Sequence, residues 1–166
     1  MLASRLWLAL LLGGLALLQT SCGGITPLWK GSHQLRNYTI YYSEPVEFQL
    51  DFNHTDKEFH ARIELVLTYY QGITRTDLPL FLIFEDASHK VTEYSARVSI
   101  KENGRWQGVL QDNEIDYTLT YDAVSDAVLQ PGKQTLKIYA NDEEAEKIVG
   151  VVRIEVRIYE IEQPGS

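Results

Sequence analysis

Apolar and polar residues alternate along most of the chain from residue 38 onward, and this period of two is typical of a β-strand. Val46–Phe52 is the clearest case, with four apolar side chains on one face and three polar ones on the other. Similar alternation, or a short apolar run, recurs at 63–69, 80–84, 94–100, 105–110, 115–121, 136–140 and 152–158. These segments and the turn residues between them predict about eight strands.

Strands at this spacing, without an amphipathic helix of three turns, predict an all-β fold. We expect an antiparallel two-sheet β-sandwich, of the jelly-roll or the immunoglobulin-like kind, over residues 38–161, followed by a short tail at 162–166. The continuous apolar run at 80–84 is what a central strand buried on both faces would show. Residues 122–129 could hold one helical turn.

The N-terminus has the layout of a secretory signal peptide followed by a lipid attachment site. Arg5 precedes an apolar run at 6–18, which is shorter than the ~20 residues of a membrane-spanning helix. The small residues Thr20 and Ser21 then lead to Cys22, the only cysteine of the chain. We therefore predict a signal peptide at 1–21, acylation of Cys22, and a glycine- and proline-containing tether at 22–37 that holds the sandwich near a bacterial membrane.

The net charge of the chain limits the kinds of molecule that it can bind. With 15 basic and 23 acidic residues the net charge is −8, so nucleic acid and anionic membrane surfaces repel the chain. Attachment to the membrane should therefore come from the lipid. The expected remaining partners are other proteins of the cell envelope.

Motifs for catalysis or cofactor binding are lacking in the sequence. It has no Gly-x-Ser-x-Gly, no phosphate-binding glycine loop, and no metal-ligand spacing among its four histidines. We therefore predict a non-catalytic protein with no metal site and no cofactor. Three alternatives stay open: a calcium ion at the oxygen-rich segment 112–116, a role for the acidic turn at 141–146, and a hydrolase that uses a carboxylate pair.

Tyrosine is the unusual residue type, with ten in 166 residues. Alternation places Tyr69 inward and Tyr70 outward. Because tyrosine is common at interfaces, an exposed docking face is a reasonable hypothesis. The candidates for this face are Tyr42, Tyr70, Tyr139 and Tyr159.

Asn103-Gly104 is a strong signal for a tight hairpin, because both residues accept positive φ. The segment Gly104-Arg105-Trp106-Gln107-Gly108, which begins at this glycine, resembles the Gly-x-Trp-x-Gly hairpin of the gliding-motility lipoprotein GldH family. The order of strands around it is also similar, over roughly residues 46–158. In this hairpin Trp106 would cap the core, while Gly104 and Gly108 would permit the tight backbone.

The resemblance implies a lipoprotein of the outer membrane, facing the periplasm, that serves the gliding machinery and its coupled secretion system through protein contacts. The chain departs from the family pattern at Leu110, where a further glycine is usual. The residues alone support an alternative, a carbohydrate- or peptide-binding lipoprotein that uses exposed aromatic side chains.

Overall fold

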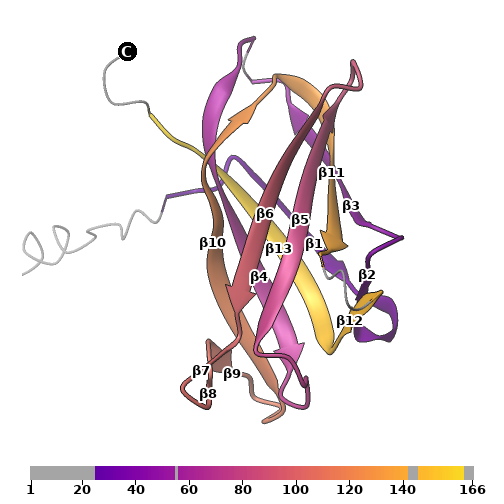
Figure 1. Cartoon of the computed structure of the whole chain (residues 1–166). Coiled ribbons are helices and arrows are strands. Elements are labelled where there is room, and N and C mark those ends of the chain that lie inside the picture. The colour runs from indigo at the N-terminus through magenta and orange to yellow at the C-terminus, as the bar shows by residue number, and fades with distance from the viewer. Residues whose placement is uncertain (1–24, 55, 142–145, 163–166) are drawn as a thin grey trace, which may run out of the picture.

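The computed structural model describes residues 25–54, 56–141 and 146–162, which form two antiparallel sheets packed face to face (Figure 1). The predicted signal peptide, Cys22 and most of the acidic turn lie outside the described residues. The larger sheet has the order β1–β13–β4–β10–β9, with bounds Trp29–Gln34, Val151–Glu160, Phe59–Tyr70, Asp116–Leu129 and Val109–Leu110. The second sheet has the order β3–β11–β5–β6, with bounds Val46–Phe52, Gly132–Ala140, Asp77–Asp86 and Val91–Ser99.

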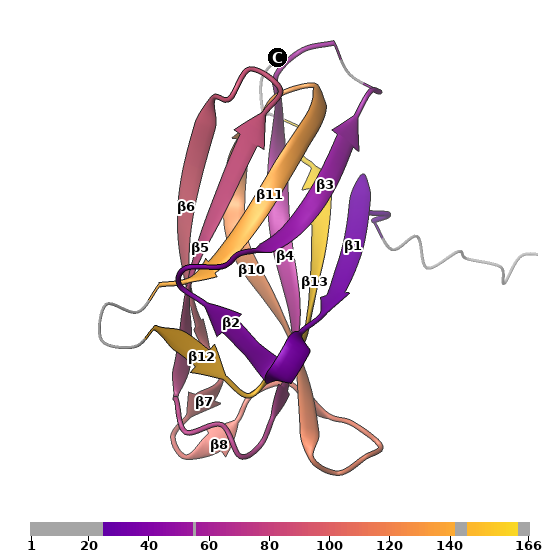
Figure 2. The same cartoon turned by 90° about the vertical axis from the view of Figure 1, so that its right-hand side faces the viewer.

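Two short antiparallel pairs and one turn of 3₁₀-helix lie at one end of the sandwich (Figure 2). β2 pairs with β12, and β7 pairs with β8. Their bounds are Thr39–Tyr41, Lys147–Val149, Lys101–Glu102 and Arg105–Trp106, and the 3₁₀-helix η1 is Arg36–Tyr38.

The eight longer strands have the connectivity of a jelly roll. Numbered along the chain, the first, eighth, third and sixth of them are neighbours in one sheet, and the second, seventh, fourth and fifth in the other. The predicted all-β sandwich is therefore confirmed, and of the two kinds expected it is the jelly roll.

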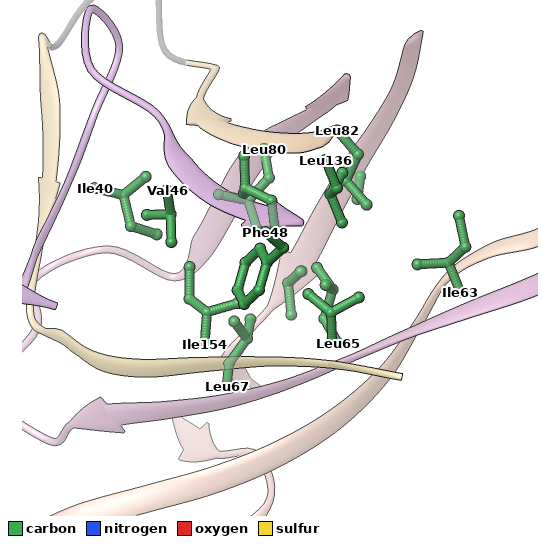
Figure 3. Close-up of a cluster of buried hydrophobic side chains, with 14 of the residues drawn as sticks. Ile40, Val46, Phe48, Ile63, Leu65, Leu67, Leu80, Leu82, Leu136 and Ile154 are labelled. Atoms are coloured by element: carbon green, nitrogen blue, oxygen red, sulfur yellow. The ribbon is translucent and has the colours of Figure 1, made fainter. Parts of the chain in front are cut away.

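The core lies between the two sheets and is built by the alternation seen in the sequence (Figure 3). In β3 the burial pattern alternates at every residue, so that Phe48 and Leu50 face the core while Glu47 and Gln49 face solvent. Every buried side-chain nitrogen and oxygen among the described residues has a hydrogen-bond partner. The core itself is made of apolar side chains, and their burial is the main favourable term in folding.

The first strand was not predicted, because β1 lies in the segment 22–37 that the sequence analysis assigns to the tether. β1 pairs with β13 over its six residues and is an edge strand. Its sequence does not alternate between apolar and polar residues. Backbone pairing with β13 holds this strand in place, so it needs little apolar burial. Trp29 adds an edge-on ring contact with Phe48 at 6.0 Å. The folded part therefore begins by Trp29, and the tether prediction is wrong for residues 29–37.

Residues 122–129 form the second half of β10 and not a helical turn. Two shifts in the pairing of β10 with β4 lie here, between Asp122 and Val124 and between Val124 and Ala127. Each shift breaks the period of two, as β-bulges do, so the segment does not show a strand pattern in the sequence.

No helix among the described residues is long and apolar enough to cross a membrane.

Candidate functional site

The outer face of the four-stranded sheet carries apolar side chains where an antiparallel sandwich usually has polar ones. Tyr139 of β11 is the pairing partner of Phe81 on β5, so the two rings lie side by side on this face. Ile83 follows two residues later on the same side of β5, and all three side chains are only half-buried. The sequence analysis expected this central strand to be buried on both faces, which is wrong for the outer face.

These residues line a shallow hollow of about 310 Å³ on the sheet surface. We call it the aromatic hollow; its lining residues are Tyr42, Phe81, Ile83, Glu93 and Tyr139. The aromatic side chains come from three different segments. No ring-to-ring contact joins any two of them in the described part of the chain, so the rings line the hollow without packing on one another.

Tyr42 reaches the hollow from the segment that joins β2 to β3. Its backbone N–H donates to the carbonyl oxygen of Glu146 at 2.9 Å, which continues the β2–β12 pairing by one residue. Its side chain is 57% exposed. The small β2–β12 sheet therefore positions one aromatic ring of the hollow at the end of the sandwich.

Glu93 is the one carboxylate in the lining of the aromatic hollow. It lies on the edge strand β6, directly opposite Ile83, and is exposed. No ion pair to Glu93 is found within the described ranges.

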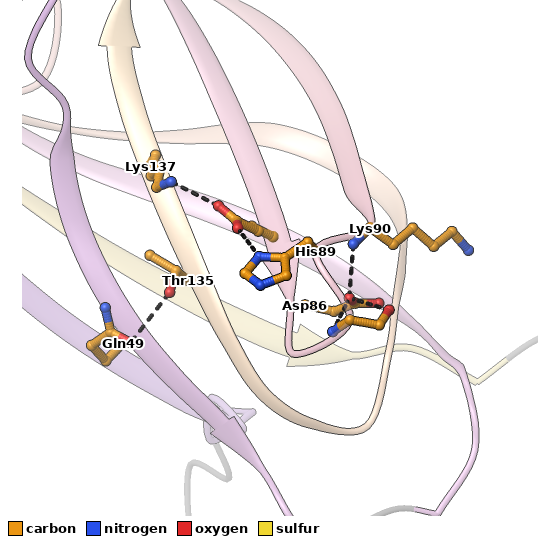
Figure 4. A network of polar contacts seen from close by, with 8 residues as sticks. Gln49, Asp86, His89, Lys90, Thr135 and Lys137 are labelled. Atoms are coloured by element: carbon orange, nitrogen blue, oxygen red, sulfur yellow. Dashed lines mark hydrogen bonds and ion pairs between the residues drawn. The ribbon is translucent and has the colours of Figure 1, made fainter.

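A second hollow, of about 360 Å³, lies on the same sheet and is lined almost entirely by polar residues; we call it the polar hollow. Figure 4 shows the polar contacts around it. Lys137 lines this hollow and is the pairing partner of Ile83, which lines the aromatic hollow, so the two hollows are neighbours on the sheet. The Nζ of Lys137 donates to Glu85 at 2.7 Å, and the Nδ1 of His89 lies 2.7 Å from the other carboxylate oxygen. Hydrogen bonds from His89 and Lys137 lower the pKa of the Glu85 carboxyl below its usual value.

The turn between β5 and β6 closes the far end of the polar hollow. Asp86 accepts hydrogen bonds from the hydroxyl and backbone N–H of Ser88 and from the backbone N–H of Lys90, at 2.7 to 3.0 Å. The hydroxyl of Ser88 is the main cause of the lowered pKa of Asp86. Thr135 and Gln49 join β11 to β3 through a hydrogen bond of 3.2 Å. The polar hollow is thus a preformed array of donors and acceptors beside the aromatic hollow.

The four tyrosines predicted to form a docking face do not share one face. Tyr42 and Tyr139 come together in the aromatic hollow. Tyr70, 45% exposed, ends β4 in the other sheet. Tyr159, only 8% exposed, is covered by the guanidinium of Arg62, which lies 4.6 Å from its ring centre.

The sequence analysis missed Phe81, Ile83 and Glu93 of the aromatic hollow. The signal for the two apolar residues was present in the run 80–84. An antiparallel sandwich without helices has no further layer to cover its outer face. Alternate members of such a run must therefore lie on the outer face, as Phe81 and Ile83 do.

The predicted hairpin residues lie at the end of the sandwich: Asn103 and Gly104 between β7 and β8, Trp106 on β8, and Gly108 just after it. Asn103 and Gly104 form the two-residue turn with φ of 49° and 78°. Trp106 packs against Tyr69 and Tyr117, with ring centres 6.0 and 6.1 Å away. Burial raises the pKa of Tyr69 to about 12, and its hydroxyl donates to the backbone carbonyl of Gln107.

A third hollow, of about 670 Å³, lies elsewhere, near η1. Its lining comes mostly from η1, β2 and the segment between β2 and β3, and the one tyrosine in it is Tyr41. It does not gather aromatic side chains from neighbouring strands. We therefore assign the candidate site to the outer face of the four-stranded sheet.

The acidic residues that the structure describes bear on the metal alternatives. Within the described ranges, no three His, Cys, Asp or Glu side chains come together as metal ligands. In the segment 112–116, the side-chain oxygen of Asn113 accepts hydrogen bonds from the backbone N–H groups of Ile115 and Asp116. This oxygen is thus used by the turn itself, which argues against the calcium alternative.

A polar network crosses the outer face of the five-stranded sheet. Arg157 donates to Glu155 at 2.7 Å and to Glu64 at 3.0 Å, and Lys30 lies 3.2 Å from Glu155. Burial disfavours the ionised form of Glu155, but hydrogen bonds from Arg157 and Lys30 outweigh it and lower the pKa. A glycosidase acid needs a raised pKa, and Glu155 does not show one.

Comparisons with known proteins give a likeness of fold only. No family model and no curated protein matches the chain. Among solved structures, a family 35 carbohydrate binding module from Clostridium thermocellum matches with 13% identity, over 77% of this chain and 97% of that one, at a TM-score of 0.40. A second module of this family, in complex with a glucuronic acid containing disaccharide, matches with 15% identity, over 85% and 84% of the two chains, at 0.42.

The Cry4Aa toxin from Bacillus thuringiensis matches with 12% identity and a TM-score of 0.47, over 82% of this chain and 22% of the toxin. At such identities and TM-scores these neighbours say nothing about a ligand. The functional argument must come from the residues of this chain.

Proposed function

We propose that this protein is a non-catalytic carbohydrate-binding domain held at the bacterial cell envelope, with the aromatic hollow as its ligand site. The observation that carries the proposal is the pair Tyr139 and Phe81, side by side and half-exposed on the outer face of the four-stranded sheet. Exposed apolar groups that gather from several segments are typical of ligand sites.

The chemistry of the two hollows suits a sugar. A pyranose ring has apolar C–H groups on its faces and hydroxyl groups around its rim. Its face can pack on the rings of Phe81 and Tyr139, while its rim can exchange hydrogen bonds with the polar hollow next to them. A mainly apolar site with a few fixed polar groups is the usual design of small-ligand sites.

The place of the domain is inferred from the sequence. The apolar run at 6–18 and Cys22 support export and lipid attachment, as set out above. A domain held in this way at the envelope would meet cell-wall, capsular or environmental glycans.

The test is a glycan array probed with the full chain in detergent, followed by calorimetry on the glycans that bind. Tyr139→Ala and Phe81→Ala should each weaken binding by about tenfold or more, as expected for a central contact of about 1.4 kcal/mol. Tyr70→Ala is the matched control, because this exposed tyrosine lies in the other sheet. It should bind like the unaltered protein.

Saturable glycan binding that all three variants retain equally would place the ligand elsewhere. The absence of binding to any glycan would refute the proposed function. Circular dichroism of each variant should first show an unchanged fold.

A protein-binding role, as the GldH resemblance implies, is the second candidate, and a separate surface favours it. Four exposed apolar side chains lie where the short strand β9 pairs with β10 and where β10 begins: Tyr70, Val109, Leu110 and Ile115. Val109 is 69% exposed, and Asp116, next to Ile115, is the pairing partner of Tyr70. We propose this surface, the β9 surface, as the contact for an envelope protein.

The resemblance names the partner class, gliding-motility and secretion components. Affinity capture from detergent-solubilised envelopes should recover such components with the unaltered chain and lose them with the double variant Val109→Ser and Leu110→Ser. Tyr139→Ala should leave the capture unchanged. Capture that is insensitive to both β9 substitutions would contradict this assignment.

A further inference from the structure

Glu93 is the charged group in the lining of the aromatic hollow, and its charge is not neutralised by a neighbour. It lies opposite Ile83 on the edge strand β6, with its carboxylate exposed on the same face as Phe81 and Tyr139. An unpaired carboxylate beside three aromatic rings is an unusual surface feature, because charged residues are rare in apolar patches.

Two cations on this face are already paired with other carboxylates. Lys137, across β5 from Glu93, donates to Glu85 at 2.7 Å. Arg97, further along β6, forms an ion pair with Asp77. The aromatic hollow therefore keeps a net negative charge.

The rings add to this preference for a cation. The face of a tyrosine or phenylalanine ring carries partial negative charge and attracts a cation within about 6 Å of its centre. A carboxylate and several aromatic rings that border one hollow together form an environment for a positively charged group. The overall charge of −8 acts in the same direction.

We infer that the preferred ligand is a sugar with a free, protonated amino group, which is held by Glu93 while the ring lies on Phe81 and Tyr139. This inference rests on the proposed carbohydrate-binding function. It narrows the ligand class to glycans with glucosamine-type residues that are not N-acetylated. The amine would donate to the Glu93 carboxylate in a charge-assisted hydrogen bond.

The test compares two ligands that differ at the amine, glucosamine trisaccharide and N-acetylglucosamine trisaccharide, by calorimetry with the full chain in detergent. The free amine should bind about fivefold or more tightly, the range expected for one partly exposed ion pair with an added cation–π contribution. The preference should shrink as salt is added, because an exposed ion pair is screened.

Glu93→Gln keeps the size of the side chain and removes its charge. It should reduce the preference for the amine to less than about twofold, and the loss should come from weaker binding of the free-amine sugar. Glu102→Gln, an exposed glutamate on β7, is the matched control and should keep the full preference.

Equal or tighter binding of the acetylated sugar would overturn the inference, as would an undiminished preference in Glu93→Gln. If neither sugar binds while other glycans on the array do, the inference fails and the proposed function stands. If no glycan binds at all, both fall together.

Discussion

At Gly108 the backbone passes so close to β10 that no side chain fits. A Cβ there would collide with the backbone carbonyl group of Thr118, and the residue has a φ of 85°. Gly104 has a similar φ of 78°, but a Cβ at that position would meet nothing within 4 Å. The two glycines of the Gly-x-Trp-x-Gly segment thus have different reasons to be glycine: conformation alone at Gly104, conformation and space at Gly108.

This difference predicts unequal costs for the same substitution. Gly104→Ala should lower the free energy of unfolding by about 1–2 kcal/mol, the cost of a positive φ for a residue with a Cβ. Gly108→Ala should cost clearly more, because β10 must also move. Urea unfolding of both variants measures the two costs, and equal losses would contradict the close approach described for Gly108.

The ion pair between Lys137 and Glu85 joins two central elements, β11 and β5. The pKa of Glu85 is lowered from 4.5 in the folded state, mainly by His89 and then by Lys137. The unfolded state therefore binds this proton more readily, so the stabilisation is fully present above pH 4.5 and is lost as the pH falls through the folded-state pKa. The pKa of Lys137 is raised above 10.5, so the stabilisation that its charge contributes is present below that pH and is lost only as the pH rises through the folded-state pKa.

We therefore expect Lys137→Met to be less stable than the unaltered protein at neutral pH, and the difference to shrink as the solution is acidified. Urea unfolding at a series of falling pH values measures it. Lys133→Met is the control: it changes another lysine of β11, and no ion pair of Lys133 is found in the part of the chain described by the structure. A difference for Lys137→Met that stays constant at low pH would show that Glu85 is not the partner.

Elements that alternate strictly were predictable, and those held by backbone pairing or interrupted by bulges were not. β3 shows the first case, because its buried and exposed residues follow the sequence pattern at every position. β1 is held by backbone pairing: at the edge of the sheet it forms hydrogen bonds to β13 and buries few apolar side chains. The later half of β10 was hidden by its two register shifts.

For the candidate site, the sequence indicated two of the five lining residues, Tyr42 and Tyr139. Their meeting depends on which strands are neighbours, and the tyrosines alone do not encode that order. Phe81 and Ile83 were assigned to the interior, because an apolar run does not show which of its faces is covered. Glu93 could be recognised only after the pairing of β5 with β6 was known.

At the scale of the whole molecule, lipid attachment at Cys22 is the prediction with the widest consequences. Mass spectrometry of the N-terminal peptide from native membranes should find a chain that starts at Cys22 and carries two or three acyl groups. Multiple acyl chains hold a protein stably on a membrane, whereas one does so only marginally. Cys22→Ser should leave the protein uncleaved or released from the membrane fraction. An unmodified cysteine in the native protein would refute the anchor.

The pairing of β1 with β13 has a mechanical consequence. β1 begins at Trp29, away from the β2–β12 pair (Figure 2). Tyr42 directly follows β2, and Tyr139 lies at the end of β11 opposite Phe81. A pull between an N-terminal anchor and a ligand in the aromatic hollow would therefore run along the strands. Hydrogen bonds of an antiparallel pair lie across the strand direction, so such a pull loads the β1–β13 ladder as a whole in shear and does not peel it open bond by bond. The β1–β13 ladder would then bear the load between the N-terminal anchor and the bound ligand.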